Sequence, residues 1–170
     1  MLIIFNILNR RIFLLKSGRS RESIDVTSEV EDIAKLYESP CLLLSLNELE
    51  NSYIHLSNAL PGVGLYYAIK ANSCDQIVQK LYELGCNFDV STNAECKLLE
   101  DLNVPASKAI HTHPVKSESE IEYAIKFGVQ EFTVDNICEL QKFEKVKDKV
   151  LINVRISIDN DDCRINLSRK

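Results

Sequence analysis

The sequence predicts an α/β fold in which short parallel strands alternate with helices. Five segments rich in β-branched and aromatic residues recur about every twenty residues, the spacing of one strand plus one helix. Apolar residues at helical spacing lie between these segments, and capping residues stand where the helices should begin. Strands joined by crossover helices must run parallel, so the repeat indicates a parallel sheet.

The composition is that of a globular protein. Of the 170 residues, 45% are hydrophobic and 26% are charged, which excludes a disordered or low-complexity chain. The net charge of −5 argues against a nucleic-acid-binding protein, and the apolar runs are too short to cross a membrane. The six cysteines are too sparse for a disulfide scaffold and form no C-x-x-C pair, so we expect reduced thiols in a cytoplasmic protein.

Residues 1–25 are expected to form an N-terminal extension, and residues 26–170 the folded domain. Apolar clusters and basic residues without an acid run from Met1 to Arg21, which leaves an unstructured segment and a targeting segment open as interpretations. A short helix is predicted over Val30–Tyr37, because Pro40 would stop it. Next come a buried strand over Cys41–Leu44 and a helix that opens on a capping box and continues to Ala59.

The repeating part of the chain follows. The predicted strands are Gly64–Ile69, Asn87–Val90, Ala109–Thr112, Glu131–Val134 and Val150–Ile156. Apolar helical stripes between and after them are Ile77, Val78, Leu81 and Leu84; Leu98, Leu99 and Leu102; Ile121, Ala124 and Ile125; and Ile137, Leu140 and Phe143. The predicted helix starts are Ser73 with Gln76, Thr92 with Glu95, Ser117 with Glu120, and Asn136. Gly85 and Gly128 stand where helices should end.

The number of repeats falls short of a closed barrel. A (β/α)8 barrel takes about 250 residues, whereas this chain carries five strand–helix units. The fold is therefore either an open sheet or a partial barrel that stops before closure.

Polar residues stand where the predicted strands end. In parallel α/β proteins these positions form the functional site, and here they hold Lys70, Asn72, Asp89, His111, His113, Asp135 and Arg155. Lys70 is unusual because it ends an apolar strand. Burial there would favour its neutral amine, the form that condenses with an aldehyde. The alternative, a strand-end lysine that pairs with Asp89, stays open.

The segment Tyr67–Asn72 resembles the cofactor-lysine motif of the fold-type III pyridoxal-phosphate decarboxylases, whose barrel is similar to that of alanine racemase. Four later segments resemble the same family in unbroken order; they are Gly85–Ser91 with Glu95, Ile110–Lys116, Phe132–Asp135 with Glu139 and Leu140, and Val154–Ser168. The last of these is most similar to ornithine decarboxylases. His113 departs from the asparagine usual at its position.

The resemblance implies a TIM-type (β/α)8 barrel that binds pyridoxal 5'-phosphate, of which residues 26–170 would be an incomplete part. It implies that Lys70 holds the cofactor as a Schiff base, that Asp89 lies near this lysine, and that Arg155 lies close to the cofactor ring. The implied reaction is decarboxylation of a small basic amino acid, ornithine or lysine, to a diamine for polyamine synthesis. The full-length enzyme would be a homodimer.

The family's phosphate-binding glycine loop and substrate-contacting residues have no counterpart in this sequence. We therefore expect the chain to be the front portion of such an enzyme and to be inactive alone. A non-catalytic decoy that binds a decarboxylase subunit, and a racemase-type barrel, remain as alternatives. No metal site is expected, because His111 and His113 lack a third ligand and the acidic run Asp159–Asp162 lacks the pattern of a calcium loop.

Overall fold

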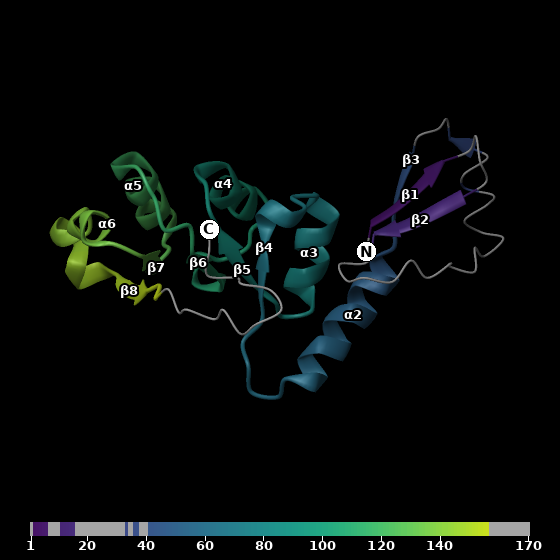
Figure 1. The fold of residues 1–170 in the computed structure, drawn as a ribbon, viewed down its shortest axis with the longest axis horizontal. Coiled ribbons are helices and arrows are strands. Elements are labelled where there is room, and N and C mark those ends of the chain that lie inside the picture. Colours follow the sequence, from purple (N-terminus) through teal and green to yellow (C-terminus); the bar gives the residue numbers. More distant parts are fainter. Residues whose placement is uncertain (1, 7–10, 16–32, 34–35, 38–40, 157–170) are drawn as a thin grey trace, which may run out of the picture. The chain divides into compact units, whose positions relative to one another are not determined.

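The computed structural model describes residues 2–6, 11–15, 33, 36–37 and 41–156 (Figure 1). They divide into two compact units, residues 1–60 and 61–170. No helix in the described part of the chain has the length and apolarity needed to cross a membrane. Residues 159–168 lie outside the described residues. They contain the acidic run Asp159–Asp162 and part of the last segment on which the resemblance rests.

The first unit contains a three-stranded sheet and one helix. Strand β1 (Leu2–Asn6) pairs antiparallel with both β2 (Arg11–Leu15) and β3 (Cys41–Leu44). Helix α2 (Leu46–Ala59) begins where Ser45 accepts a hydrogen bond from the backbone N–H of Glu48, as the capping pattern predicts. The helix predicted over residues 30–37 lies largely outside the described residues, and the domain boundary at residue 25 stays a prediction.

The second unit is the predicted parallel sheet, in the order β4-β5-β6-β7-β8. Its strands are β4 (Tyr66–Ala68), β5 (Asn87–Val90), β6 (Ala109–His111), β7 (Glu131–Val134) and β8 (Leu151–Val154). Its helices are α3 (Asp75–Glu83), α4 (Asn93–Asp101), α5 (Glu118–Phe127) and α6 (Ile137–Gln141), with 3-10 turns η2 (Ile69–Ala71), η3 (Ala106–Lys108) and η4 (Glu144–Lys149). The described strands do not close into a barrel, because β4 and β8 each pair on one side only.

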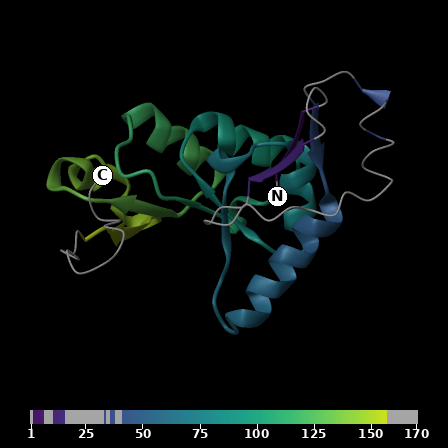
Figure 2. The same ribbon diagram turned by 45° about the vertical axis from the view of Figure 1, so that its right-hand side comes forward.

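The core lies between this sheet and the helices that follow one another along one side of it (Figures 1 and 2). Side chains alternate along a strand, so buried Phe88 and Val90 face opposite to half-buried Asn87 and Asp89 in β5. The same alternation holds in β7. We call the face that carries Asp89 the inner face, and the face packed on the helices the outer face.

The helix starts follow the predicted pattern except at α3. Ser117 and Glu120 form a complete capping box, and Asn136 accepts from the backbone N–H of Glu139. The box predicted from Ser73 and Gln76 is wrong, because α3 begins one residue later, after Cys74, without a side-chain cap. Gly128 ends α5 with φ of +114°, a conformation that suits glycine.

The apolar stripe predicted for α6 is wrong in part. Ile137 and Leu140 are 68% and 40% exposed, and only Phe143 is buried. Glu139 takes the inward position on α6, because its carboxylate accepts hydrogen bonds from the backbone N–H of Lys116 and from the Lys142 ammonium. A satisfied polar contact has replaced apolar packing here.

Phe88→Ala tests the outer-face core. Phe88 is fully buried, so the substitution should lower the free energy of unfolding by about 3–5 kcal/mol, measured by urea denaturation. Val63→Ala, at a side chain that is 56% exposed, is the control and should change it little. Equal losses in the two variants would contradict this description of the core.

Candidate active site

Strand pairing brings three of the predicted site residues to one end of the sheet. Asp89 lies beside Ala68 in the pairing of β5 with β4, and Lys70 follows two residues later in η2. At the other side of the sheet the backbone N–H of Arg155 donates to the carbonyl of Val134 over 2.8 Å, which extends the β7–β8 pairing to Arg155. Lys70, Asp89 and Arg155 thus all stand at the carboxyl ends of their strands, where parallel α/β proteins bind ligands.

Lys70 is held by a short, well-bonded turn. The Tyr67 hydroxyl donates to the carbonyl of Asn72 over 3.0 Å, and the Asn72 side chain accepts from the backbone N–H of Cys74 over 3.1 Å. Burial raises the pKa of Tyr67, so this hydroxyl stays a donor. The expectation that Lys70 is buried is wrong, because its side chain is exposed in the turn that follows β4.

Asp89 is bonded to a residue that the sequence did not single out as a site residue. The Thr112 hydroxyl donates to Oδ1 of Asp89 over 2.5 Å, joining the end of β5 to the residue after β6. Among the described residues no ion pair links Asp89 to Lys70, so the alternative of a strand-end lysine paired with Asp89 is not what the structure shows. The only sequence signal for Thr112 was its place as the last residue of a predicted strand.

Arg155 is paired with Asp135 across β7 and β8. A guanidinium nitrogen lies 2.5 Å from Oδ2 of Asp135, and Asn136 donates to the other carboxylate oxygen over 2.9 Å. Desolvation opposes ionisation of Asp135, but the hydrogen bonds from Asn136 and Arg155 outweigh it and lower the pKa of this carboxyl. The sequence placed both residues at strand ends, and the structure brings them into contact.

The two histidines predicted at the end of β6 do not share a site. His111 is 1% exposed on the outer face and stacks on the Phe132 ring at a centroid distance of 5.7 Å. His113 is exposed, with Nδ1 at 2.5 Å from the carbonyl of Val115. The expectation that His111 lies at the functional site is therefore wrong. In the strand pairing His111 stands beside buried Val90 and Phe132, so its ring packs on the outer face.

A buried lysine fixes the loop between β6 and α5. Lys116 is 1% exposed, and its ammonium donates to the carbonyls of His113, Pro114 and Thr133 over 2.7, 3.2 and 2.6 Å. Burial lowers the pKa of Lys116, and the nearby Glu139 carboxylate acts in the opposite direction. Sequence reasoning missed this residue because lysine is rarely found inside a core.

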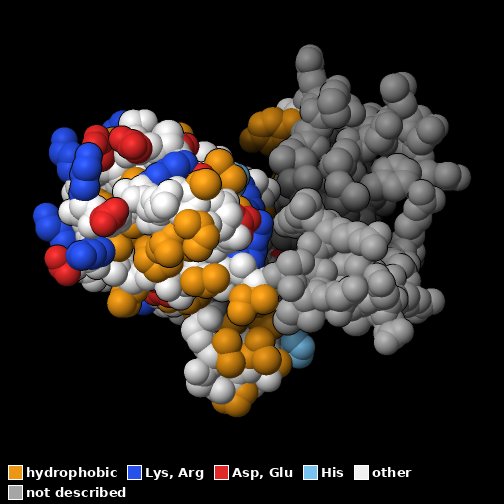
Figure 3. Space-filling model, turned by 60° about the vertical axis from the view of Figure 1, so that its left-hand side comes forward, with side chains coloured by type: hydrophobic (Ala, Val, Ile, Leu, Met, Phe, Trp, Pro, Cys, Tyr) orange, Lys and Arg blue, Asp and Glu red, His pale blue; other side chains and the backbone are white. Residues whose placement is uncertain are grey.

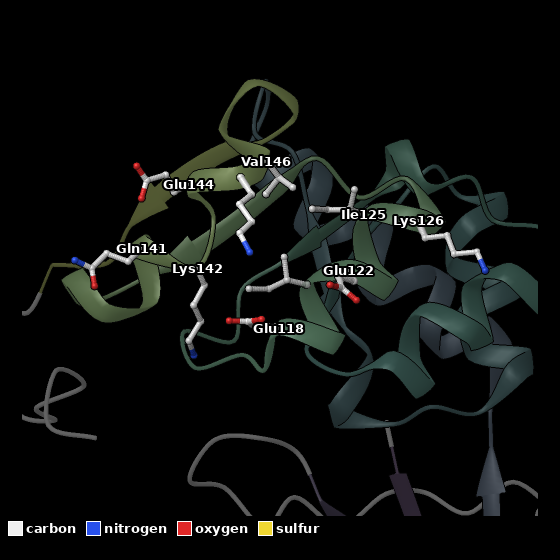
Figure 4. A pocket seen from close by; sticks show the side chains of 10 residues that line it. Glu118, Glu122, Ile125, Lys126, Gln141, Lys142, Glu144 and Val146 are labelled. Atoms are coloured by element: carbon white, nitrogen blue, oxygen red, sulfur yellow. The ribbon is translucent and has the colours of Figure 1, made fainter.

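A pocket of about 570 Å³ lies between α5 and the α6–η4 segment (Figure 4). Ile121, Ile125 and Val146 supply its apolar part, and charged side chains of α5 and of the α6–η4 segment surround them. None of the three strand-end residues lines it. On the face shown in Figure 3, lysine and arginine side chains lie among aspartate and glutamate, so no continuous basic surface is seen on that face.

Comparison with known proteins identifies the class to which this arrangement belongs. Residues 46–170 match the family described as "Pyridoxal-dependent decarboxylase, pyridoxal binding domain". The lysine/ornithine decarboxylase of Selenomonas ruminantium is 34% identical over 84% of this chain and 36% of its own length. Antizyme inhibitor 2 of Xenopus laevis is 33% identical over 88% of this chain and 32% of its own length.

The fold agrees with that of a solved member. The crystal structure of lysine/ornithine decarboxylase from Vibrio vulnificus, complexed with putrescine, matches with a TM-score of 0.75 and 37% identity, covering 78% of this chain and 38% of that one. The chain belongs to the pyridoxal-dependent decarboxylases and carries their pyridoxal-binding domain. It spans about a third of the length of the curated relatives it matches. The cofactor of this domain is pyridoxal 5'-phosphate, and its fold is part of their TIM-type barrel.

The strand-end residues have the chemistry that this cofactor requires. Lys70 supplies a primary amine, the group that condenses with an aldehyde, and it forms no ion pair with the other described residues. Asp89 supplies a carboxylate, and Arg155 supplies further N–H donors beyond the one bound to Asp135. The donor set therefore fits pyridoxal phosphate, and the roles of these three residues stay predictions.

The pH dependence of stability tests the buried state of His111. Burial first, and then the nearby Lys116 ammonium, lower the pKa of His111 to about 4. As the pH falls, the imidazole of His111 takes up a proton near pH 6.5 in the unfolded chain but only near pH 4 in the folded chain. The free energy of unfolding therefore decreases between these two pH values. The loss should reach about 3 kcal/mol at pH 4.

Urea denaturation across this pH range, with His111→Phe as the comparison, measures the effect. The variant keeps a ring against Phe132 and should lose this part of the pH dependence. An unchanged pH profile in the variant would show that His111 does not titrate as described.

Proposed function

We propose that the protein carrying this chain decarboxylates a basic amino acid, ornithine or lysine, to a diamine and CO2. The observation that carries this proposal is the placement of Lys70, Asp89 and Arg155 at the carboxyl ends of β4, β5 and β8 in a pyridoxal-binding domain. The relatives named for lysine and ornithine decarboxylation support the substrate class.

When bound, pyridoxal phosphate accepts the electrons that remain on the α-carbon when CO2 leaves. Lys70 would hold the cofactor through its Nζ atom and, once displaced by the substrate amine, would return a proton from the same atom. Asp89 would provide the negative charge close to this amine. Arg155, kept in place by Asp135, would donate to an oxygen of the cofactor ring. The family holds the phosphate with a glycine loop, for which this chain offers no candidate.

A non-catalytic decoy is the alternative, since an antizyme inhibitor is also among the relatives. Retention of the amine, the carboxylate and the guanidinium at the strand ends favours the enzyme, because a decoy needs none of these groups for chemistry. Turnover by the protein separates the two proposals.

We propose in addition that the whole protein is a cytoplasmic homodimer acting on a small amino acid. Four cysteines whose side chains the structure describes are free thiols, which supports a reducing compartment; they are Cys74, Cys86, Cys96 and Cys138. Burial raises the pKa of the Cys96 thiol to about 11, as suits an unreactive core residue. The homodimer is inferred from the family resemblance alone.

Lys70→Ala in the whole protein should lower the decarboxylation of ornithine and of lysine at least about a hundredfold, because both cofactor attachment and proton return depend on this amine. The measurement is CO2 release with pyridoxal phosphate in excess. Lys126→Ala, at an exposed lysine of α5, is the matched control and should keep its rate. Absence of turnover in the unchanged protein would favour the decoy, and equal rates in both variants would remove Lys70 from the mechanism.

A further inference from the structure

We propose that Thr112 is a positioning residue whose hydroxyl orients the Asp89 carboxylate for the cofactor. This inference rests on the proposed function, because it takes Asp89 as a cofactor-binding residue. It adds a residue that the strand-end pattern and the family resemblance leave without a role.

The contact itself is short and charge-assisted. The Thr112 hydroxyl donates to Oδ1 of Asp89 over 2.5 Å, within the range for an O–H group bound to a carboxylate. Both side chains are half-buried, so water competes for this hydrogen bond less than it would at the surface. With Oδ1 engaged, the rotation of the carboxylate is restricted and Oδ2 remains available to a ligand.

Thr112 can act in this way because its backbone is fixed on both sides. Its N–H donates to the carbonyl of Val90 over 3.3 Å, which continues the β5–β6 pairing one residue beyond β6. The loop after it is held by the buried Lys116 ammonium, which binds the carbonyls of His113, Pro114 and Thr133. The hydroxyl is therefore presented from a rigid position and not from a mobile loop.

The order of the strands places this hydrogen bond beside the strand that leads to Lys70. Asp89 on β5 lies between β4, which is followed by Lys70, and β6, which is followed by Thr112. Among the described residues Asp89 forms no ion pair with Lys70, and its side-chain hydrogen-bond partner is the Thr112 hydroxyl.

The affinity for pyridoxal phosphate, measured by absorbance titration of the purified full chain, tests the inference. Thr112→Val removes the hydroxyl at nearly constant volume and should weaken binding about tenfold, since a hydrogen bond to a charged group is lost. Thr112→Ser keeps the hydroxyl and should restore the affinity. Thr133→Val is the matched control, because Thr133 is a half-buried threonine on the inner face of β7. Thermal unfolding of each variant shows whether the fold is retained.

A double-mutant cycle with Asp89→Asn separates positioning from a structural role. If Thr112 acts through Asp89, adding Thr112→Val to Asp89→Asn should cause little further loss of affinity. A full additional loss, or an equal loss in Thr133→Val, would overturn the inference. Equal affinities of Thr112→Val and the unchanged chain would overturn it while leaving the proposed function intact. Failure of the unchanged chain to bind the cofactor would overturn the cofactor assignment of Lys70 and Asp89, and this inference with it.

Discussion

The parallel pairing of β4 to β8 is the constraint on which the candidate site depends. Because side chains alternate along each strand, the pairing that sends Phe88 and Phe132 into the helix layer also sends Asp89 to the other face. A shift of a strand by one residue would exchange these sets and remove the site together with the core. Burial of the apolar residues therefore fixes where the polar ones stand.

Polar contacts fix the loop that follows β6. Lys116, Glu139 and Lys142 form one network, in which the Lys142 ammonium donates to both the Lys116 carbonyl and the Glu139 carboxylate over 2.6 Å. Glu139 is buried, so removal of the Lys142 ammonium would leave a buried charge to which, among the described residues, the backbone N–H of Lys116 alone donates a hydrogen bond. The network connects the segment that carries Thr112 to α6, which follows the strand end that carries Asp135.

Much of the fold could be predicted from local patterns. Strands β5 and β7 have the predicted ends, and the parallel order follows from the crossover helices. The placement of Lys70, Asp89 and Arg155 at the same end of the sheet, the carboxyl ends of the strands, follows from the same repeat. The burial of a residue that contacts several segments distant in the sequence could not be predicted in this way.

Three residues show why. His111 was expected at the site because it ends a strand, but which face it takes depends on the pairing with Val90 and Phe132. Lys116 is buried only because three carbonyls from two segments converge on it. The exposure of Lys70 depends on the packing of the whole chain, which no local pattern encodes.

The central claim is that the amine of Lys70 carries the cofactor. Borohydride reduction of the chain after incubation with pyridoxal phosphate, followed by peptide mass spectrometry, locates the amine that reacted. We expect a stable adduct on the peptide that contains Lys70, and none on exposed lysines such as Lys97 and Lys126. An adduct on another lysine, or spread over the surface lysines with Lys70 unmodified, would contradict it.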